Sequence, residues 1–204
     1  MDNELRQSEK EAVARAAAFA DDTLRPHAAA WERARALPPE VFESAADAGL
    51  TAAILPVEVG GDAVSMQCAA RMAEVLAAAD FGFAFALKVH ANAANAIARR
   101  GTDEQRHRLL PEMIDGRRIG AFCLTEPGVG SDATAITCRA APETGGWTVT
   151  GDKAWVTNGV VADVMSVYVQ TDPEAGWRGI ANLLIEGDFT GLSRGEPCSM
   201  IGGH

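Results

Sequence analysis

The sequence predicts an α+β fold in which an all-helical domain, residues 1–117, precedes an antiparallel β domain, residues 118–204. The hydrophobic period is the first observation that predicts it. Apolar residues recur at helical spacing up to about residue 117 and gather in short β-branched and aromatic runs beyond Ile119. The second observation is composition. Alanine is plentiful before about residue 100 and sparse after Ala141, whereas Gly, Thr, Val and Trp concentrate in the second half.

Helical spacing and helix breakers place the first elements. An apolar stripe along Val13–Leu24, with charged residues on the opposite face, predicts an amphipathic helix that Pro26 interrupts. A second helical stretch follows, and a third helix begins at Pro38-Pro39 and ends at Gly49. The segment Leu55–Gly61 contains a proline and two glycines, so it is expected to form a loop.

Two longer helices and one short helix are expected after this loop. The apolar stripe of Met66–Ala77 predicts the first, and the Phe- and Ala-rich stretch of Asp80–Ile97 predicts the second. Gly101 is expected to close the second helix as its C′ residue. Thr102–Gln105 has the spacing of a capping box, which begins another short helix that ends near Gly116.

Short strands are expected in the second domain. The runs that predict them are Trp147–Thr150, Ala154–Thr157, Val164–Gln170 and Ile180–Ile185, with Gly, Asn and Asp marking turns between them. Trp155 and Thr157 then face the same side of one strand, which places an aromatic surface beside a hydroxyl. A planar heteroaromatic ligand would suit this pair. The alternative is a core tryptophan in a strand that ends at the Asn158-Gly159 turn.

A second segment with chemical potential lies where helices give way to strands. It is Phe122–Asp132, with the sequence FCLTEPGVGSD. Its glycines let the backbone turn tightly and approach a ligand closely, and Thr125 and Ser131 offer hydroxyls beside exposed amides. Such a loop suits a polar ring edge or a phosphate. From this spacing alone, an ordinary strand connection is the alternative.

The two segments together closely resemble the acyl-CoA dehydrogenase family, in which a T-E-P-G-x-G-S-D segment and a W-[IV]-T-N-G segment line the flavin of FAD. Thr125–Asp132 matches the first and Trp155–Gly159 the second. Pro56–Gly61 resembles the family's P-x-x-x-G-G loop, and Gly101–Gln105 with Leu110-Pro111 resembles its G-T-x-E-Q…L-P signature. The resemblance implies an acyl-CoA dehydrogenase-like fold, incomplete here, with a β-barrel-like second domain that lacks its last strands.

The resemblance also implies the cofactor-binding residues, which are Phe122, Leu124, Thr125, Gly130, Ser131, Trp155, Val156 and Thr157. The first three correspond to positions that pack on the flavin or hydrogen-bond it. Gly130 and Ser131 correspond to positions near its phosphates, and Ser131 also to one near the acyl-thioester substrate. Trp155 is expected to cover one face of the isoalloxazine. Thr157 is expected to direct its hydroxyl at the flavin edge that accepts the hydride.

The implied reaction is the α,β-dehydrogenation of an acyl thioester, acyl-CoA or acyl-carrier protein, to a trans-2-enoyl thioester with reduction of FAD. Electrons usually leave through an electron-transferring flavoprotein. The proton goes to a carboxylate of a carboxy-terminal helical bundle, which the chain lacks before His204. We therefore expect no catalytic base within the chain and no turnover by the chain alone.

Several explanations stay open for the missing bundle. A partner chain supplies the bundle and the base in a split enzyme, or the sequence is a shortened form of a complete dehydrogenase. A third explanation is a non-catalytic flavin-binding or scaffold subunit, and homo-oligomerisation is open as well. Flavin monooxygenases and oxidases share the fold, so they are the alternative enzyme class.

Three other polar residues invite a catalytic interpretation. His90 is expected to be a packed position of a helix. Glu126 and Asp132 are expected to be structural because nothing places Glu126 against a substrate carbon.

Composition excludes several other classes. The net charge of −10 argues against non-specific nucleic-acid binding. No apolar run approaches the roughly 20 residues that span a bilayer, and the charged first residues contain no signal-peptide core, so a cytoplasmic location is expected. The four cysteines are widely spaced, which indicates neither a zinc site nor a disulfide framework.

Overall fold

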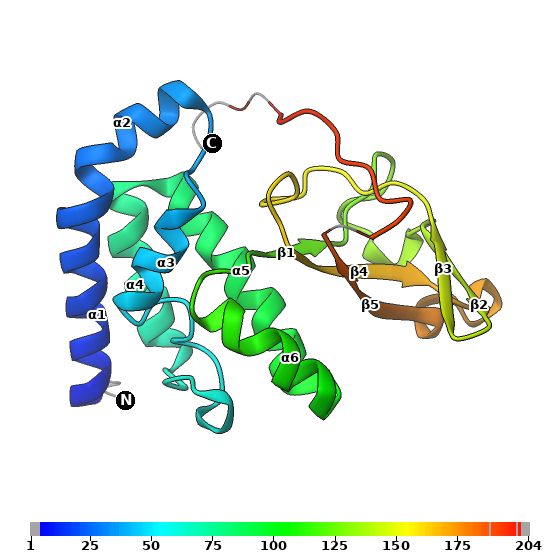
Figure 1. Ribbon diagram of the computed structural model, residues 1–204, viewed down its shortest axis with the longest axis horizontal. Coiled ribbons are helices and arrows are strands. Elements are labelled where there is room, and N and C mark those ends of the chain that lie inside the picture. The colour runs from blue at the N-terminus through cyan, green and yellow to red at the C-terminus, as the bar shows by residue number, and fades with distance from the viewer. Residues whose placement is uncertain (1–4, 188, 199, 201–204) are drawn as a thin grey trace.

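The computed structural model describes residues 5–187, 189–198 and 200, and shows a helical part followed by a sheet part (Figure 1). The helices are α1 (Gln7–Phe19), α2 (Arg25–Ala34), α3 (Glu40–Asp47), α4 (Met66–Ala79), α5 (Phe81–Arg100) and α6 (Asp103–Ile114). The strands are β1 (Gly120–Cys123), β2 (Arg139–Glu143), β3 (Gly146–Thr150), β4 (Val164–Gln170) and β5 (Ile180–Glu186). A π-helical turn, Ala20–Leu24, joins α1 to α2. None of the described helices is long and apolar enough to cross a membrane.

The helical part buries the apolar stripes that its sequence shows. Helix α4 lies between α1 and α5 (Figure 1). Aromatic rings of α1, α3 and α5 pack together in the core of the helical part. The Phe83 ring centroid lies 5.5 Å from that of Phe19 and 6.1 Å from that of Phe42. Pro26 lies in the first turn of α2, directly after the π-helical turn, so the helical path changes its hydrogen-bond pattern at this proline and does not break there.

The junction of α5 with α6 confirms the capping box and corrects the role of Gly101. The Thr102 hydroxyl accepts a hydrogen bond from the Gln105 amide at 3.2 Å, and the Gln105 side chain accepts one from the Thr102 amide at 2.9 Å. Gly101 does not adopt the left-handed conformation expected of a C′ residue, because its φ is −64°. A side chain there would collide with the Ile97 carbonyl, 2.6 Å from the position of a Cβ atom, so close approach explains the glycine.

The sheet is mixed, which corrects the expectation of an antiparallel domain. Strand β1 pairs in parallel with β4, whereas β5 pairs antiparallel with β4 and β3 pairs antiparallel with β2. Strand β2 meets β4 through a single parallel bridge, Arg139 to Gln170. The long connection after β1 brings the chain back to the end of the sheet where β1 starts, so that β4 begins there and runs parallel to β1. Within the described residues the sheet is open and does not close into a barrel.

The strand expected at Ala154–Thr157 is absent. Residues 151–163 form an irregular segment with turns, in which Trp155 has a φ of 57° and Asn158 a φ of 65°. Positive φ values are incompatible with a strand. Trp155 is 72% exposed, so it is not the core tryptophan of the alternative interpretation either. Side chains that tie this segment to its neighbours override the β propensity of its sequence.

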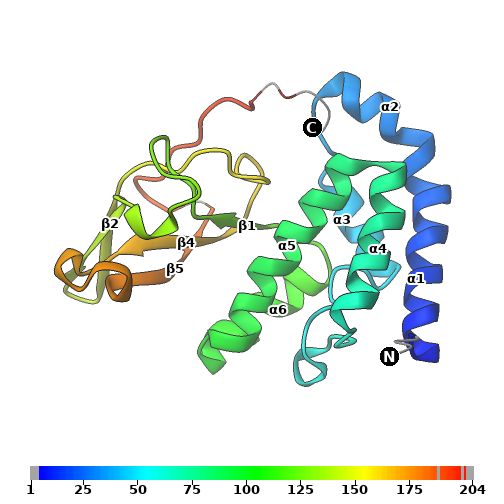
Figure 2. The ribbon, with the colours of Figure 1, turned by 180° about the vertical axis from the view of Figure 1, so that it is seen from behind.

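Helices α5 and α6 lie between the rest of the helical part and the sheet (Figure 2). Ile97, Leu109 and Met113 of these helices pack with Val164 at the start of β4. Glu186 at the end of β5 accepts hydrogen bonds from Arg108 at 2.5 Å and from Arg118 at 3.0 Å. The Arg108 hydrogen bond is the largest influence that lowers the pKa of Glu186. Apolar packing and ion pairs therefore both join the two parts.

Candidate functional site

The two segments that the sequence marks for chemistry lie against each other. We define the first loop as residues 124–138, after β1, and the second loop as residues 151–162, before β4. The Ala154 amide donates a hydrogen bond to the Thr125 carbonyl at 2.9 Å. The Lys153 ammonium donates another to the Leu124 carbonyl at 3.0 Å. Segments separated along the chain thus form one continuous surface.

A buried carboxylate organises the first loop. Glu126 is 4% exposed, and its oxygens accept hydrogen bonds from the Thr137 amide and hydroxyl, both at 2.7 Å, and from the Cys138 amide at 2.9 Å. The Lys153 ammonium donates a fourth at 2.8 Å. Burial alone raises the pKa of Glu126, but these hydrogen bonds outweigh burial and hold the pKa at about 2. The carboxylate is therefore ionised, both of its oxygens accept hydrogen bonds from the protein, and its role is structural.

The outer edge of the first loop is open. The Glu126 and Val129 backbones bond each other in a tight turn, with N···O distances of 3.0 and 3.1 Å. A Cβ atom added at Gly128 or Gly130 would meet nothing within 4 Å, and neither glycine has a positive φ. The chain itself therefore does not require glycine at these positions, whereas a closely approaching ligand would. Ser131 lies exposed beside them, and Asp132 accepts hydrogen bonds from Thr134.

The second loop presents an aromatic side chain at the cost of backbone strain. The left-handed conformation of Trp155 costs about 1–2 kcal/mol for a residue with a Cβ atom. Its indole is nevertheless largely exposed, so packing within the chain does not repay this cost. Val156 packs against the buried face of the sheet, and Thr157 is half-buried. A flat ligand stacked on the indole would offset the cost of this strained conformation.

Comparison with known proteins identifies the family of this chain. The description "Acyl-CoA dehydrogenase, N-terminal domain" matches residues 6–117, and "Acyl-CoA dehydrogenase, middle domain" matches residues 121–202. The chain belongs to the acyl-CoA dehydrogenase family. A curated relative, the mitochondrial isobutyryl-CoA dehydrogenase of Dictyostelium discoideum, is 33% identical over 198 residues, which cover 97% of this chain and 48% of the relative.

Two solved structures superpose closely on the chain. The FAD complex of PigA matches with a TM-score of 0.88 and 32% identity, over 96% of this chain and 52% of that one. Glutaryl-CoA dehydrogenase from Mycobacterium smegmatis matches with a TM-score of 0.85 and 33% identity, over 93% of this chain and 48% of that one. The chain spans about half the length of the curated relatives it matches.

The predicted flavin residues of this acyl-CoA dehydrogenase family member occupy three places. Leu124 and Thr125 lie at the contact between the loops, with Trp155, Val156 and Thr157 on the neighbouring segment. Gly130 and Ser131 lie on the open edge of the first loop. Phe122 lies on β1, where its ring centroid is 5.0 Å from that of Tyr168 on β4. The structure therefore joins the two loops and sets Phe122 on the adjoining sheet.

Sequence reasoning missed two residues that hold the loops. Lys153 reaches Glu126 and Leu124, and its side chain is 10% exposed. Its pairing with a carboxylate in another loop leaves no local pattern to detect. The Asn158 side chain donates hydrogen bonds to the Ala86 carbonyl at 3.0 Å and the Gly120 carbonyl at 2.9 Å. The Asn158-Gly159 dipeptide marks a turn, which is the signal that points to Asn158.

His90 is a packed residue of α5. It is fully buried, and burial lowers its pKa to about 4. Its Nε2 atom lies 3.0 Å from the Met113 carbonyl, and the Gly120 amide donates to Nδ1 at 3.1 Å. The neutral tautomer with its proton on Nε2 satisfies both hydrogen bonds. In the described residues, no three His, Cys, Asp or Glu side chains lie together as metal ligands would.

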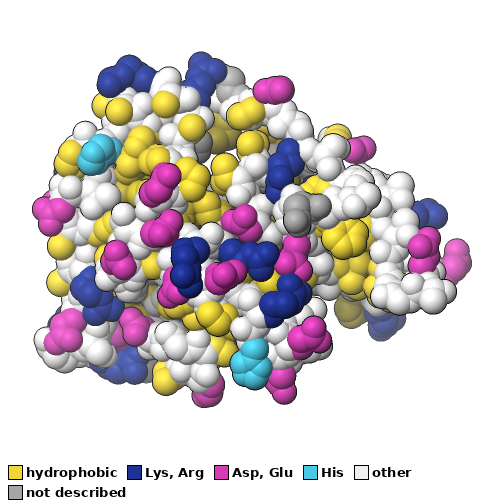
Figure 3. Space-filling view, viewed as in Figure 1, with side chains coloured by type: hydrophobic (Ala, Val, Ile, Leu, Met, Phe, Trp, Pro, Cys, Tyr) yellow, Lys and Arg dark blue, Asp and Glu magenta, His cyan; other side chains and the backbone are white. Residues whose placement is uncertain are grey.

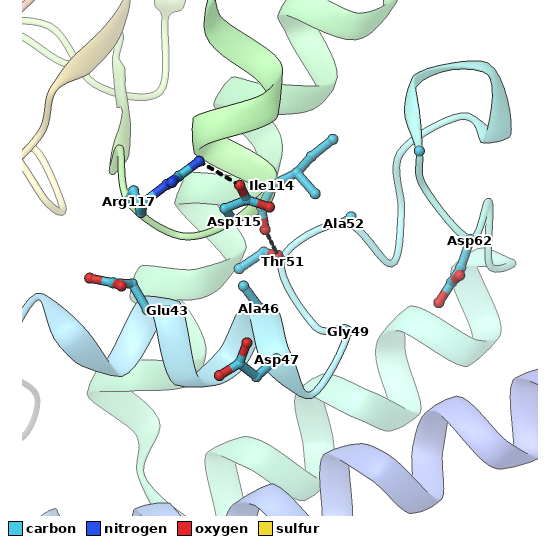
Figure 4. A pocket seen from close by; sticks show the side chains of 11 residues that line it. Glu43, Ala46, Asp47, Gly49, Thr51, Ala52, Asp62, Ile114, Asp115 and Arg117 are labelled. Carbon is cyan, nitrogen blue, oxygen red and sulfur yellow. Dashed lines mark hydrogen bonds and ion pairs between the residues drawn. The ribbon is translucent and has the colours of Figure 1, made fainter.

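A cavity of about 420 Å³ lies elsewhere, in the helical part. Glu43, Asp47 and Asp115 contribute carboxylates to its lining, and Arg117 pairs with Asp115 at 2.6 Å (Figure 4). None of the predicted flavin residues lines it. On the face shown in Figure 3, acidic and basic side chains are interspersed. The candidate site is therefore the surface of the two loops, and this cavity is separate from it.

Proposed function

We propose that this chain forms the FAD-binding and part of the substrate-binding portion of an oxidoreductase that dehydrogenates an acyl thioester between its α and β carbons. One observation carries the proposal. The two loops that match the family's flavin segments are hydrogen-bonded to each other; one carries a strained, exposed Trp155 and the other an open glycine edge. That surface offers an aromatic face for a ring and free amides for phosphates.

The residues present fit FAD. Bound FAD would supply the hydride acceptor of the reaction. In this proposal, the Trp155 indole covers one face of the isoalloxazine, and Thr157 directs its hydroxyl at the ring edge. Leu124 and Thr125 border the ring with backbone groups. Gly130 and Ser131 leave room for phosphates and for the thioester, because no side chain occupies the space next to Gly130.

We infer that proton abstraction uses a base from outside the described residues. Glu126 is held ionised by four hydrogen bonds and has no free oxygen lone pair aimed at the open surface. Asp132 accepts hydrogen bonds from Thr134 within its own turn. We propose that a second chain carrying a helical domain supplies the base in a split or heteromeric enzyme, and that an electron-transferring flavoprotein accepts the electrons.

Purification tests this proposal. The protein would be isolated with whatever co-elutes, its visible flavin spectrum recorded, and any second chain identified by mass. Under anaerobic conditions the preparation should oxidise an acyl-CoA in the presence of an artificial electron acceptor. A requirement for oxygen together with a reduced flavin supply would instead support a monooxygenase of the same fold. An aggregated, flavin-free protein without a partner would contradict the proposal.

A non-catalytic flavin-binding subunit is the second candidate. The hydrogen bonds of Glu126 favour it, since they occupy both oxygens of the buried carboxylate at the contact between the loops, so this carboxylate is not available as the base. Bound FAD without turnover, in the presence of every co-eluting chain and of several acyl-CoA lengths, would establish this alternative. Turnover under any of these conditions would exclude it.

A further inference from the structure

Helices α5 and α6 meet the sheet at Gly120, the first residue of β1. A Cβ atom at Gly120 would lie 2.8 Å from the Met113 methyl group and 2.9 Å from the Ala93 side chain. The helices therefore approach the backbone of β1 as closely as glycine allows. The two parts of the chain make direct contact at this residue.

Both backbone polar groups of Gly120 are bound by side chains. Its amide donates to Nδ1 of His90 on α5, at 3.1 Å, and its carbonyl accepts from the Asn158 side chain, at 2.9 Å. The Asn158 amide group also donates to the Ala86 carbonyl of α5, at 3.0 Å. One side-chain amide thus joins the second loop, α5 and β1.

The backbone of Asn158 is tied as firmly as its side chain. Its carbonyl accepts hydrogen bonds from the Val161 amide at 3.0 Å and the Ala162 amide at 2.8 Å. Its left-handed φ of 65° suits asparagine better than most residues with a Cβ atom. Because Trp155 and Thr157 precede it by three residues and one residue, fixing Asn158 limits where both can lie.

We propose that Asn158 is a positioning residue, which holds the Trp155 indole and the Thr157 hydroxyl at a set place relative to helix α5 and strand β1. The inference rests on the proposed function, because Trp155 and Thr157 are the residues that would meet FAD. It assigns the asparagine no contact with FAD. The helical part then contributes to the geometry of the flavin site through one amide group.

Asn158→Gly isolates this role. Glycine accepts the left-handed backbone and removes both side-chain hydrogen bonds. We expect amide hydrogen exchange across residues 153–162 of the FAD-free protein to rise about tenfold, while exchange within α5 stays unchanged. The Kd for FAD, measured with every chain that co-purifies, should rise about tenfold as well.

Two control variants separate positioning from general destabilisation. Met72→Ala creates a cavity among the helices, far along the chain from both loops, and should lower the melting temperature without changing the FAD Kd. Arg194→Ala removes hydrogen bonds to the Gly159 and Ala162 carbonyls, so it loosens the second loop without breaking its link to α5. We expect its FAD Kd to change by less than about threefold.

The outcomes distinguish this inference from the proposed function. If the unaltered protein does not bind FAD, the proposed function fails, and hydrogen exchange still decides whether Asn158 holds the loop. If the unaltered protein binds FAD and Asn158→Gly binds it equally well, the positioning role is overturned. Should Asn158→Gly fail to fold, Asn158→Asp tests the same bonds, because its carboxylate cannot donate to either carbonyl; unchanged exchange and Kd in that variant would also overturn the role.

Discussion

The two loops of the candidate site are held by different means. The first loop closes around its own buried carboxylate, since Glu126 binds backbone groups of Thr137 and Cys138 within the same loop. The second loop contains no such centre, and its anchors are Lys153, Asn158 and the Arg194 side chain that reaches it from the segment after β5. Only the second loop carries strained non-glycine residues.

This difference assigns the loops different physical roles. A loop organised from within keeps its shape when its neighbours move, which would suit the proposed role of its amides toward a phosphate. A loop anchored to a helix, a strand and another loop takes its position from all three. The second loop should therefore respond to changes elsewhere in the chain, and the first should respond mainly to changes at Glu126.

The largest expected effect follows from removing the centre of the first loop. Glu126→Ala leaves the Lys153 ammonium buried without its carboxylate and frees the amides of Thr137 and Cys138. We expect the free energy of unfolding to fall by about 3 kcal/mol, measured with denaturant at pH 7. A fall below about 1 kcal/mol would show that the first loop does not depend on this charge.

A double variant sharpens this prediction. Glu126→Gln with Lys153→Met removes both charges together, so it leaves no ammonium without a partner in the protein interior. The loss of stability should then be smaller than the sum of the two single losses. Additive losses would mean that the two side chains act independently.

The helices and strands show how much of the fold could be predicted from the sequence. The helix stripes and three of the strand runs depend on local spacing, and the structure has them where the sequence places them. Strands β1 and β2 lie outside the predicted runs. Strand β2, with two alanines and a proline, has little β propensity and is held by pairing with β3. The parallel pairing of β1 and the bond from Lys153 to Glu126 are long-range contacts, which no local pattern encodes.

For the candidate site, motif matching located the loops but not their shape. The expected strand at Trp155 follows from its β-branched and aromatic neighbours, and long-range anchors replace it with a strained turn. The Asn158-Gly159 dipeptide did carry the turn signal. The roles toward FAD of all eight predicted residues stay predictions: Phe122, Leu124, Thr125, Gly130, Ser131, Trp155, Val156 and Thr157.

Acid should act on the junction between α5 and β1, where His90 binds Gly120, before it acts on the first loop. The folded pKa of His90 is about 4 against 6.5 for the free side chain, so the folded state favours the neutral ring. The neutral His90 ring contributes fully to the free energy of unfolding above pH 6.5. This contribution is lost as the pH falls toward 4, and the loss is about 2 kcal/mol at pH 5. His90→Gln should remove most of this slope between pH 7 and 5 in denaturant unfolding experiments.

The carboxylate of Glu126 provides the contrast. Its folded pKa of about 2 lies below its ordinary value of 4.5, so its contribution is lost only as the pH falls from about 4.5 toward 2. Hydrogen exchange at pH 5 should therefore rise around Gly120 and the second loop before it rises in the first loop. Simultaneous loss of protection in both loops would contradict the separate anchoring.

Replacing Trp155 should change stability and FAD binding in opposite directions. Trp155→Gly relieves the left-handed strain and removes little packing, because the indole is mostly exposed. We expect the free energy of unfolding to rise by about 0.5–1 kcal/mol, whereas the Kd for FAD rises about tenfold. Trp155→Ala keeps the strain and should lose FAD affinity without the gain in stability. Equal stability of the two variants would show that the strain at this residue is negligible.

The smallest expected effect concerns the open edge of the first loop, and it tests whether the glycines there serve a ligand. Gly130→Ala adds a methyl group into open space at a residue whose φ is not positive, so the unfolding free energy should change by less than about 0.5 kcal/mol. If FAD phosphates approach this backbone, the same methyl group should raise the FAD Kd by about threefold or more. Gly145→Ala is the matched control on the β2–β3 turn, where a positive φ of 85° makes the substitution strained although the space is equally open. It should therefore lower stability without affecting FAD, the reverse of the pattern at Gly130, and an unchanged Kd for Gly130→Ala would place the phosphates elsewhere.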